Sequence, residues 1–160
     1  MTRSFDNSVL NLDSNVHIVY QQITDKEFFF ILKVESHQAV CPTCSSIAQR
    51  VHSRYTRNII DLPAGGTSVH LQLLTKKWFC DRPTCKIKVF TERLHWLHPY
   101  ARKTNRLEET IRHIGFSTNC LTAEKVCQML GIPISHDAIL RRLKEPINKP
   151  EVNCPFRRNR

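Results

Sequence analysis

Two cysteine pairs, Cys41-Pro42-Thr43-Cys44 and Cys80-Asp81-Arg82-Pro83-Thr84-Cys85, decide how this chain folds. They are separated by the 35 residues from 45 to 79. Four thiols in two short loops have the ligand number and spacing of a structural Zn²⁺ site, in which four thiolates leave no open position for a substrate. The spacing therefore predicts one bound zinc ion that stabilises the fold. The intervening residues are long enough for a β-hairpin that brings the second pair back to the first.

Two other roles for these cysteines are less consistent with the sequence. A redox-active Cys-x-x-Cys pair needs a βαβ context, and no long helical pattern follows Cys44. Disulfide bonds are disfavoured because the seven cysteines occur without a secretory signal sequence. The remaining cysteines, Cys120, Cys127 and Cys154, are then unpaired thiols, which suits a reducing compartment.

The chain is strongly basic, with a formal charge of +10 and an isoelectric point near 9.6. Residues 1–40 have a net charge of −2, whereas residues 41–98 and 99–160 each have +6. The positive excess therefore starts at the first cysteine, which favours a polyanionic partner such as nucleic acid, although basic charge also serves solubility. The longest apolar run, residues 28–32, is far shorter than the ~20 residues that cross a bilayer, so we expect no membrane segment.

Apolar residues in alternation or in short runs predict β-strands on both sides of the first cysteine pair. The first two strands, joined by the turn Thr24-Asp25-Lys26, form a hairpin that leads to Cys41. The pattern of residues 49–60 is mixed, and Asp61-Leu62-Pro63-Ala64-Gly65-Gly66 predicts a loop. The predicted strands are residues 16–20, 28–34, 69–79 and 87–90. Strands that end in metal-binding loops are typical of a zinc ribbon.

After about Pro99 the apolar residues follow the period of an α-helix. We expect three helices, the first with Thr104 as its N-cap, the second starting near Thr122, and the third with Ser135 as its N-cap. Their expected buried faces are Leu107, Ile111 and Ile114 in the first helix, Ala123, Val126 and Leu130 in the second, and Ile139, Leu140 and Leu143 in the third.

A glycine-bearing turn, Gly131-Ile132-Pro133-Ile134, joins the second helix to the third. Two helices joined in this way, with basic residues off the core face, are typical of a helix-turn-helix. Cys127 lies where a small residue lets such helices cross closely, so we interpret it as a packing residue. The sequence thus predicts an α+β chain in which a small zinc-ribbon-like β module precedes a three-helix helix-turn-helix. The expected parts are a β-hairpin and zinc-finger domain at 1–98, a helix-turn-helix domain at 99–145, and a linker or frayed tail at 146–160.

No group of residues predicts catalysis. Ser135, His136 and Asp137 are adjacent, but neighbours on a helix point about 100° apart and cannot form a hydrogen-bonded triad. His95 and His98 are not expected as metal ligands because four thiols already complete the site. We therefore expect no catalytic residues and no enzymatic activity from the chain as it stands.

The candidate DNA-binding residues are basic or polar side chains near the cysteines, before the first helix and on the third helix. Contacts with phosphates are expected from His52, Arg54, Arg57, Lys76, Lys77, Arg102, Lys103 and Arg106. For Lys76 and Lys77 a solvated strand edge is the alternative. The candidates near the major groove are Ser135, His136, Asp137, Arg141, Arg142 and Lys144.

The chain resembles the N-terminal part of bacterial insertion-sequence transposases of the ISL-three type. The resemblance covers about residues 38–145. The resembling stretches are Cys41-Pro42-Thr43-Cys44, Arg50-Val51-His52-Ser53-Arg54-Tyr55, Asp61-Leu62-Pro63, Lys76-Lys77-Trp78-Phe79-Cys80, Phe90-Thr91-Glu92-Arg93-Leu94, Tyr100-Ala101-Arg102, Thr104-Asn105-Arg106-Leu107 and Leu130-Gly131-Ile132-Pro133-Ile134-Ser135. It implies a zinc finger and a helix-turn-helix that bind the terminal inverted repeats of the element. In that family a DDE-type domain follows and cuts DNA with divalent metal.

We therefore expect the DNA-binding N-terminal portion of an insertion-sequence transposase, located in the bacterial cytoplasm with the nucleoid. Its expected partners are duplex DNA and a second copy of the chain or a full-length transposase. The sequence ends at Arg160, before a DDE domain could begin, so we expect a truncated reading frame or a separate DNA binder derived from a transposase. Two alternatives stay open, a zinc-dependent transcription regulator with its own operator and a zinc-scaffolded protein-interaction adaptor.

Overall fold

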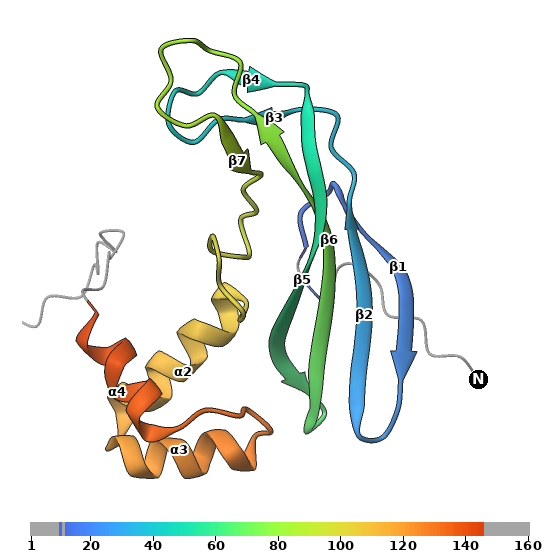
Figure 1. The fold of residues 1–160 in the computed structure, drawn as a ribbon. Coiled ribbons are helices and arrows are strands. Elements are labelled where there is room, and N and C mark those ends of the chain that lie inside the picture. The colour runs from blue at the N-terminus through green and yellow to red at the C-terminus, as the bar shows by residue number, and fades with distance from the viewer. Residues whose placement is uncertain (1–9, 11, 146–160) are drawn as a thin grey trace, which may run out of the picture.

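The computed structural model describes residue 10 and residues 12–145. It confirms the α+β class, with a β-rich body followed by three helices (Figure 1). The strands are β1 Val16–Ile23, β2 Glu27–Val34, β3 Ala39–Val40, β4 Ile47–Ala48, β5 Val51–Ala64, β6 Thr67–Phe79 and β7 Val89–Thr91. The helices are α2 Asn105–Ser117, α3 Cys120–Met129 and α4 His136–Lys144. The tail expected at 146–160 lies outside the described residues.

The larger sheet has the strand order β1-β2-β6-β5, and β7 pairs with the end of β6. The predicted N-terminal hairpin is confirmed, since β1 and β2 are antiparallel. Its turn is stabilised by Thr24, whose Oγ1 donates a hydrogen bond to the carbonyl oxygen of Glu27 at 2.9 Å. β2 runs parallel to β6, whereas β5 and β7 are antiparallel to it. Because Cys80 directly follows β6, this strand connects the sheet to the cysteines.

The hairpin β5–β6 fills the interval between the cysteine pairs, as expected. Its turn consists of Gly65 and Gly66, whose φ angles of 60° and 80° are the left-handed values that a two-residue hairpin turn requires. The prediction of a loop from Asp61 to Gly66 was wrong at its first four residues, because β5 continues through Ala64. Pro63 is tolerated there because β5 lies at the edge of the sheet, and the pairing shifts register between Asp61 and Ala64. The predicted strand at 87–90 is present as β7, which begins two residues later than expected.

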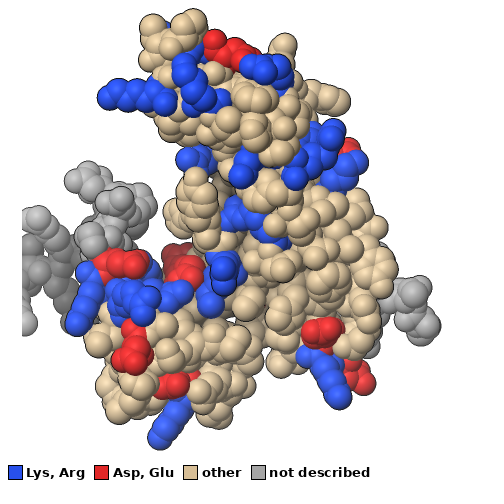
Figure 2. Space-filling model, viewed as in Figure 1, with Lys and Arg blue, Asp and Glu red and all other residues tan. Residues whose placement is uncertain are grey.

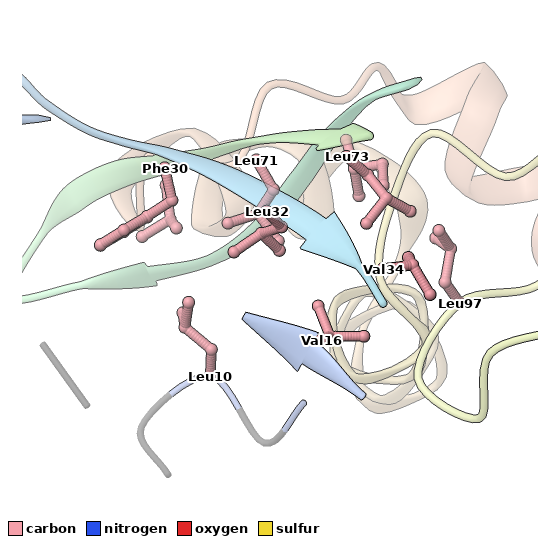
Figure 3. Packing of buried hydrophobic residues seen from close by; sticks show 10 residues of the cluster. Leu10, Val16, Phe30, Leu32, Val34, Leu71, Leu73 and Leu97 are labelled. Atoms are coloured by element: carbon pink, nitrogen blue, oxygen red, sulfur yellow. The ribbon is translucent and has the colours of Figure 1, made fainter. Parts of the chain in front are cut away.

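One face of the sheet carries the first hydrophobic core. Phe30, Leu32 and Val34 of β2 lie beside Leu71 and Leu73 of β6, all at most 1% exposed. Figure 3 shows Val16, Leu10 and Leu97 closing this core from other parts of the chain. Because burial of each such side chain contributes about 1.5–3 kcal/mol, the alternation of apolar residues in β6 is enough to fix which face turns inward.

The predicted caps of the first and third helices are confirmed. The side-chain oxygens of Thr104 and Ser135 accept hydrogen bonds from backbone N–H groups of α2 and α4, respectively. The second helix begins earlier than expected, because Asn119 caps it and accepts a hydrogen bond from the N–H of Thr122. Each cap satisfies an N–H group that would otherwise lack a partner at the start of its helix.

A second core lies among the three helices. Leu107, Ile111, Ala123 and Ile139 are fully buried there, together with Cys127, which confirms that this cysteine packs between helices. The expectation that Leu130 and Leu140 are buried was wrong, since they are 47% and 40% exposed. Leu130 is the C-cap that follows the last residue of α3, and Leu140 directly follows the buried Ile139 on α4, about 100° around the helix from it.

Gly115 sets how closely α2 approaches α4. A Cβ atom added at Gly115 would lie 2.9 Å from Cγ2 of Ile139 and 3.2 Å from Cδ2 of Leu143. Contacts this short require side chains or backbone to shift, so only glycine permits the observed packing. Within residue 10 and residues 12–145, no helix is long and apolar enough to cross a membrane.

The helices are fixed to the sheet at Ile60 and Asp61 of β5. The backbone N–H of Ile60 donates to the carbonyl of Arg102 at 2.9 Å, and its carbonyl accepts from the N–H of Thr104 at 3.1 Å. The carboxylate of Asp61 is 1% exposed and accepts hydrogen bonds from Thr104 Oγ1 at 2.6 Å and from Arg106 Nε at 2.7 Å. Arg106 also forms an ion pair with Asp61 through Nη2. Strand and helix are thus joined by a buried charge and by backbone pairing.

We predict that Asp61→Asn lowers the free energy of unfolding by about 2–3 kcal/mol, because it leaves the Arg106 guanidinium without its counter-charge. Arg106 is 33% exposed, which keeps the loss below that of a completely buried pair. The measurement is urea denaturation of zinc-loaded protein. The control is Glu35→Gln, which removes an ion pair with Lys33 whose two side chains are about half exposed. Equal stability changes for the two variants would contradict this role of Asp61.

Candidate metal centre and nucleic-acid interface

The four predicted cysteines meet at one point. Their sulfur atoms all lie within 4.8 Å of one another, with Cys41 Sγ 3.9 Å from Cys85 Sγ and Cys44 Sγ 3.5 Å from Cys80 Sγ. Cys41, Cys80 and Cys85 are buried, and Cys44 is partly exposed. Four thiols at this spacing surround a single ion, and the arrangement fits tetrahedral Zn²⁺.

Backbone hydrogen bonds shape the two cysteine loops. In the first loop, the N–H of Cys41 donates to the carbonyl of Ser46 and the N–H of Ser45 donates to the carbonyl of Cys41, each at 2.9 Å. Ser45 has φ of 58°, which allows the loop to turn back after Cys44. In the second, Cys80 directly follows β6, and the N–H of Cys85 donates to the carbonyl of Arg82 at 3.1 Å. The strands β3 and β6 thus deliver the first cysteine of each pair.

The thiols have very different affinities for protons. Hydrogen bonding from the Ser46 hydroxyl lowers the pKa of Cys44 to about 6. The N–H of Ile87 lowers the pKa of Cys85, but burial and the neighbouring thiols outweigh it and raise the value to about 12. Close thiols cannot all ionise beside one another, because like charges repel. A dication removes this repulsion, and the donor set is the one that structural zinc prefers.

Aromatic and apolar side chains pack beneath the metal centre. Trp78 and Phe90, from β6 and β7, are buried with the cysteines in a third hydrophobic cluster. On the outside, the guanidinium of Arg50 lies 4.0 Å from the centre of the Phe79 ring and pairs with Asp81. Arg50 and Asp81 were not among the predicted site residues, although Asp81 directly follows Cys80.

The structure distributes the predicted DNA-binding residues into three groups, of which the first is at the surface. The exposed candidates are His52, Arg54, Arg102, Asp137, Arg141 and Lys144. Two of them also have a neighbour within the protein, since His52 Nδ1 lies 2.9 Å from Ser53 Oγ and Asp137 Oδ1 lies 3.6 Å from His136 Nε2. Lys103 is half-buried beside Ile60, and Ser135 caps α4. Their contacts with DNA stay predictions.

The second group is engaged in contacts within the protein. Arg57 donates to the carbonyls of Ala101 and His98, and burial lowers its pKa. Arg142 forms a two-pronged ion pair with Glu108, at 2.5 and 2.9 Å, and that hydrogen bonding raises the pKa of Arg142. Arg106 is held by Asp61, as described above. The sequence carries no local signal for these contacts, since each joins residues at least 34 positions apart.

Three further candidates make weaker internal contacts. Lys76 Nζ donates to the carbonyl of Ser36 at 2.6 Å, and Lys77 Nζ lies 5.2 Å from the centre of the Tyr55 ring. His136 Nδ1 lies 2.8 Å from a carboxylate oxygen of Glu124, an interaction that lowers the pKa of Glu124. It joins the start of α4 to α3.

A hollow of about 640 Å³ extends from Pro42 in the first cysteine loop to Arg102, just before α2. It is lined by β5, β6, β7 and the segment 93–102. The cations along it are Arg57, Lys77, Arg93 and Arg102, against a single carboxylate, that of Glu92. Figure 2 shows lysine and arginine side chains over the zinc region and along the inner side of the bend towards the helices, whereas the surface over the sheet carries few charges. Arg93 was not among the predicted residues.

Residues 37–85 match a family model described as the zinc-finger of transposase IS204/IS1001/IS1096/IS1165. The matched region contains all four cysteines and the hairpin β5–β6. Comparison with curated proteins and with solved structures finds no match. The family match and the clustered thiols agree on one structural zinc ion, held by Cys41, Cys44, Cys80 and Cys85.

We predict that Cys80→Ser abolishes stoichiometric zinc binding and unfolds the cysteine loops, because metal binding supplies much of the folding free energy in such small modules. The control is Cys120→Ser, which changes a partly exposed cysteine of α3 that lies outside the cluster. Zinc content is measured by elemental analysis, and cobalt substitution with visible absorption reports thiolate coordination. Protein without metal, or a Cys80→Ser variant that keeps it, would contradict the assignment.

Proposed function

We propose that this chain is a DNA-binding, transposase-related protein that recognises the terminal inverted repeats of an insertion sequence through a zinc finger and a helix-turn-helix. The observation that carries the proposal is the four-cysteine cluster within a segment that matches a transposase zinc finger. The positive charge supports it, because residues 41–98, which contain the four cysteines, have a net charge of +6.

The zinc region and its hairpin supply phosphate contacts in this proposal. Arg54 lies on β5 opposite Lys76 of β6, and Lys77 lies one position further along β6, opposite Ser53. Arg54 and Lys77 therefore project from opposite faces of the hairpin. Arg102 follows on the segment that leads to α2. A rigid sheet that presents cations at fixed positions can bind successive phosphates of a backbone without reading bases.

The helices α3 and α4 form the proposed helix-turn-helix. The turn is closed by the N–H of Ile132, which donates to the carbonyl of Cys127 at 2.8 Å, and by Gly131, whose φ is 77°. The helix α4 then exposes Asp137, Arg141 and Lys144 along one side while Ile139 is buried on the other. This division suits a recognition helix, in which one face packs against the domain and the other enters the major groove.

The contacts between β5 and α2 hold the two proposed DNA-binding parts together. Ile60 and Leu62 of β5 pack against the helical core, in addition to the hydrogen bonds of Asp61. A fixed spacing between zinc region and helices lets one chain read a longer site than either part alone. The second copy or full-length transposase expected as a partner would extend that site further.

For the full zinc-loaded chain we predict salt-dependent DNA binding. If about six phosphates are neutralised, log K falls against log salt with a slope of roughly −5. Fluorescence anisotropy with a labelled duplex between low and moderate salt measures the slope. A flat response would favour the adaptor alternative, whereas binding to a palindromic operator in preference to element ends would favour the regulator.

Arg141→Ala and Arg54→Ala should have different effects. The proposal assigns Arg141, an exposed residue of α4, to a base edge, so its loss should cost roughly 1–3 kcal/mol at the preferred site and reduce discrimination between sequences. Arg54→Ala should weaken binding to all sequences about equally. The matched control is Lys26→Ala, in the turn between β1 and β2. Identical effects of the first two variants on preferred and random duplexes would contradict the assignment of α4 as recognition helix.

We also propose that the chain alone does not cleave DNA, since its assigned metal has four thiolate ligands and no open position. Purified protein is incubated with supercoiled plasmid carrying element ends and Mg²⁺ or Mn²⁺. We expect intact plasmid and a shifted band. Nicking that copurifies with the chain and disappears in Cys41→Ser would overturn this assignment.

A further inference from the structure

Tyr100 stands out in the segment between the zinc region and the helices. It is 91% exposed, although tyrosine usually buries much of its ring. Its φ is 62°, a left-handed value that is unfavourable for a bulky residue. Of the described residues other than glycine, Ser45 and Tyr100 alone have positive φ, and Ser45 shapes a cysteine loop. Strained and exposed aromatic residues are uncommon unless the surface is used.

The backbone on both sides of Tyr100 is firmly held. Arg57 Nη2 donates to the carbonyl of Ala101 at 2.6 Å and to that of His98 at 3.2 Å. The N–H of His98 donates to Asn105 Oδ1 at 3.0 Å, and Asn105 Nδ2 donates to the carbonyl of His95 at 2.7 Å. Several hydrogen bonds fix the backbone of this segment, which stabilises the strained conformation of Tyr100. The ring is therefore preorganised for binding.

The ring stands beside the basic hollow. Tyr100 itself lines it, together with Arg93 and Arg102 from the same segment and Lys77 from β6. The only carboxylate among the lining residues is that of Glu92, which is 9% exposed and accepts hydrogen bonds from Ser36 Oγ, Thr75 Oγ1 and the N–H of Lys76. The accessible charge around Tyr100 is therefore positive, which suits a phosphodiester backbone.

An exposed aromatic ring beside cations that can bind phosphates is suited to stack on the face of a nucleobase. In an intact duplex, neighbouring bases cover both faces of each base, except at ends, bulges and kinked steps. We propose that Tyr100 stacks on a base that has left the regular duplex stack, while Lys77, Arg93 and Arg102 bind the adjoining phosphates. This inference rests on the proposed DNA-binding function and adds a preference for distorted or unpaired DNA.

The test compares two probes, a fluorescein-labelled duplex of mixed sequence and the same duplex with a short unpaired bulge carrying 2-aminopurine. The full zinc-loaded chain should prefer the bulged probe and quench the 2-aminopurine fluorescence. Tyr100→Ala should lower affinity for the bulged probe by roughly five- to a hundredfold and abolish the quenching, because stacking on one base contributes that much. Tyr100→Phe should retain both properties.

Two controls separate a binding role from a structural one. Tyr20→Ala changes a half-exposed tyrosine of β1 and should leave binding unaffected. Tyr100→Gly relieves the backbone strain, so its melting temperature should be at least that of Tyr100→Ala, while its affinity for the bulge is lost. Wild-type preference and quenching that persist in Tyr100→Ala would overturn the inference. Wild-type binding that is equal for both probes would overturn it and leave DNA binding intact, whereas no binding to either would overturn both proposals.

Discussion

The antiparallel pairing of β5 with β6 is the interaction on which the rest of this structure depends. Its register runs from Val51 opposite Trp78 to Ala64 opposite Thr67, and each of the three hydrophobic clusters includes or adjoins part of it. The strand β6 leads directly into Cys80. Near the other end of the hairpin, Asp61 of β5 contacts the N-cap of α2. Metal centre and helical region are therefore placed by one hairpin, and Figure 1 shows them at different ends of it.

The two ends are stabilised by different physics. At the cysteine loops the apolar cluster around Trp78 and Phe90 is small, and a metal ion adds stability that so small a core cannot supply. At the helices, a buried carboxylate accepts hydrogen bonds from Thr104 and Arg106, and such a charge is tolerated only where its partners are fixed. Loss of zinc would therefore disturb the cysteine loops first, and loss of the Asp61 contacts would release the helices from the sheet.

The basic residues of the chain have divided roles, which a net charge cannot reveal. Arg57, Arg106 and Arg142 are bound to carbonyls or carboxylates of the protein and shape it. Arg54, Arg102, Arg141 and Lys144 are exposed and remain available to a polyanion. In the proposed DNA complex the first set gives rigidity, and the second set gives affinity. The same division explains why Tyr100 can be both strained and exposed, since Arg57 stabilises the backbone around it.

Local patterns in the sequence determined the zinc ligands, the hairpin between them, most strands and the caps Thr104 and Ser135, because cysteine spacing, alternation and capping depend on near neighbours. Tertiary structure alone decided the rest. The segment Asp61-Leu62-Pro63-Ala64 has the composition of a loop but continues β5, because an edge strand tolerates proline and the helices bury its carboxylate. Leu130 and Leu140 fit a helical face but are exposed, because α3 ends before Leu130 and α4 turns Ile139, not Leu140, toward the core. Arg57 and Arg142 contact residues that are far from them in the chain, and the hollow beside Tyr100 is lined by several distant segments. Only the folded arrangement could bring these residues together.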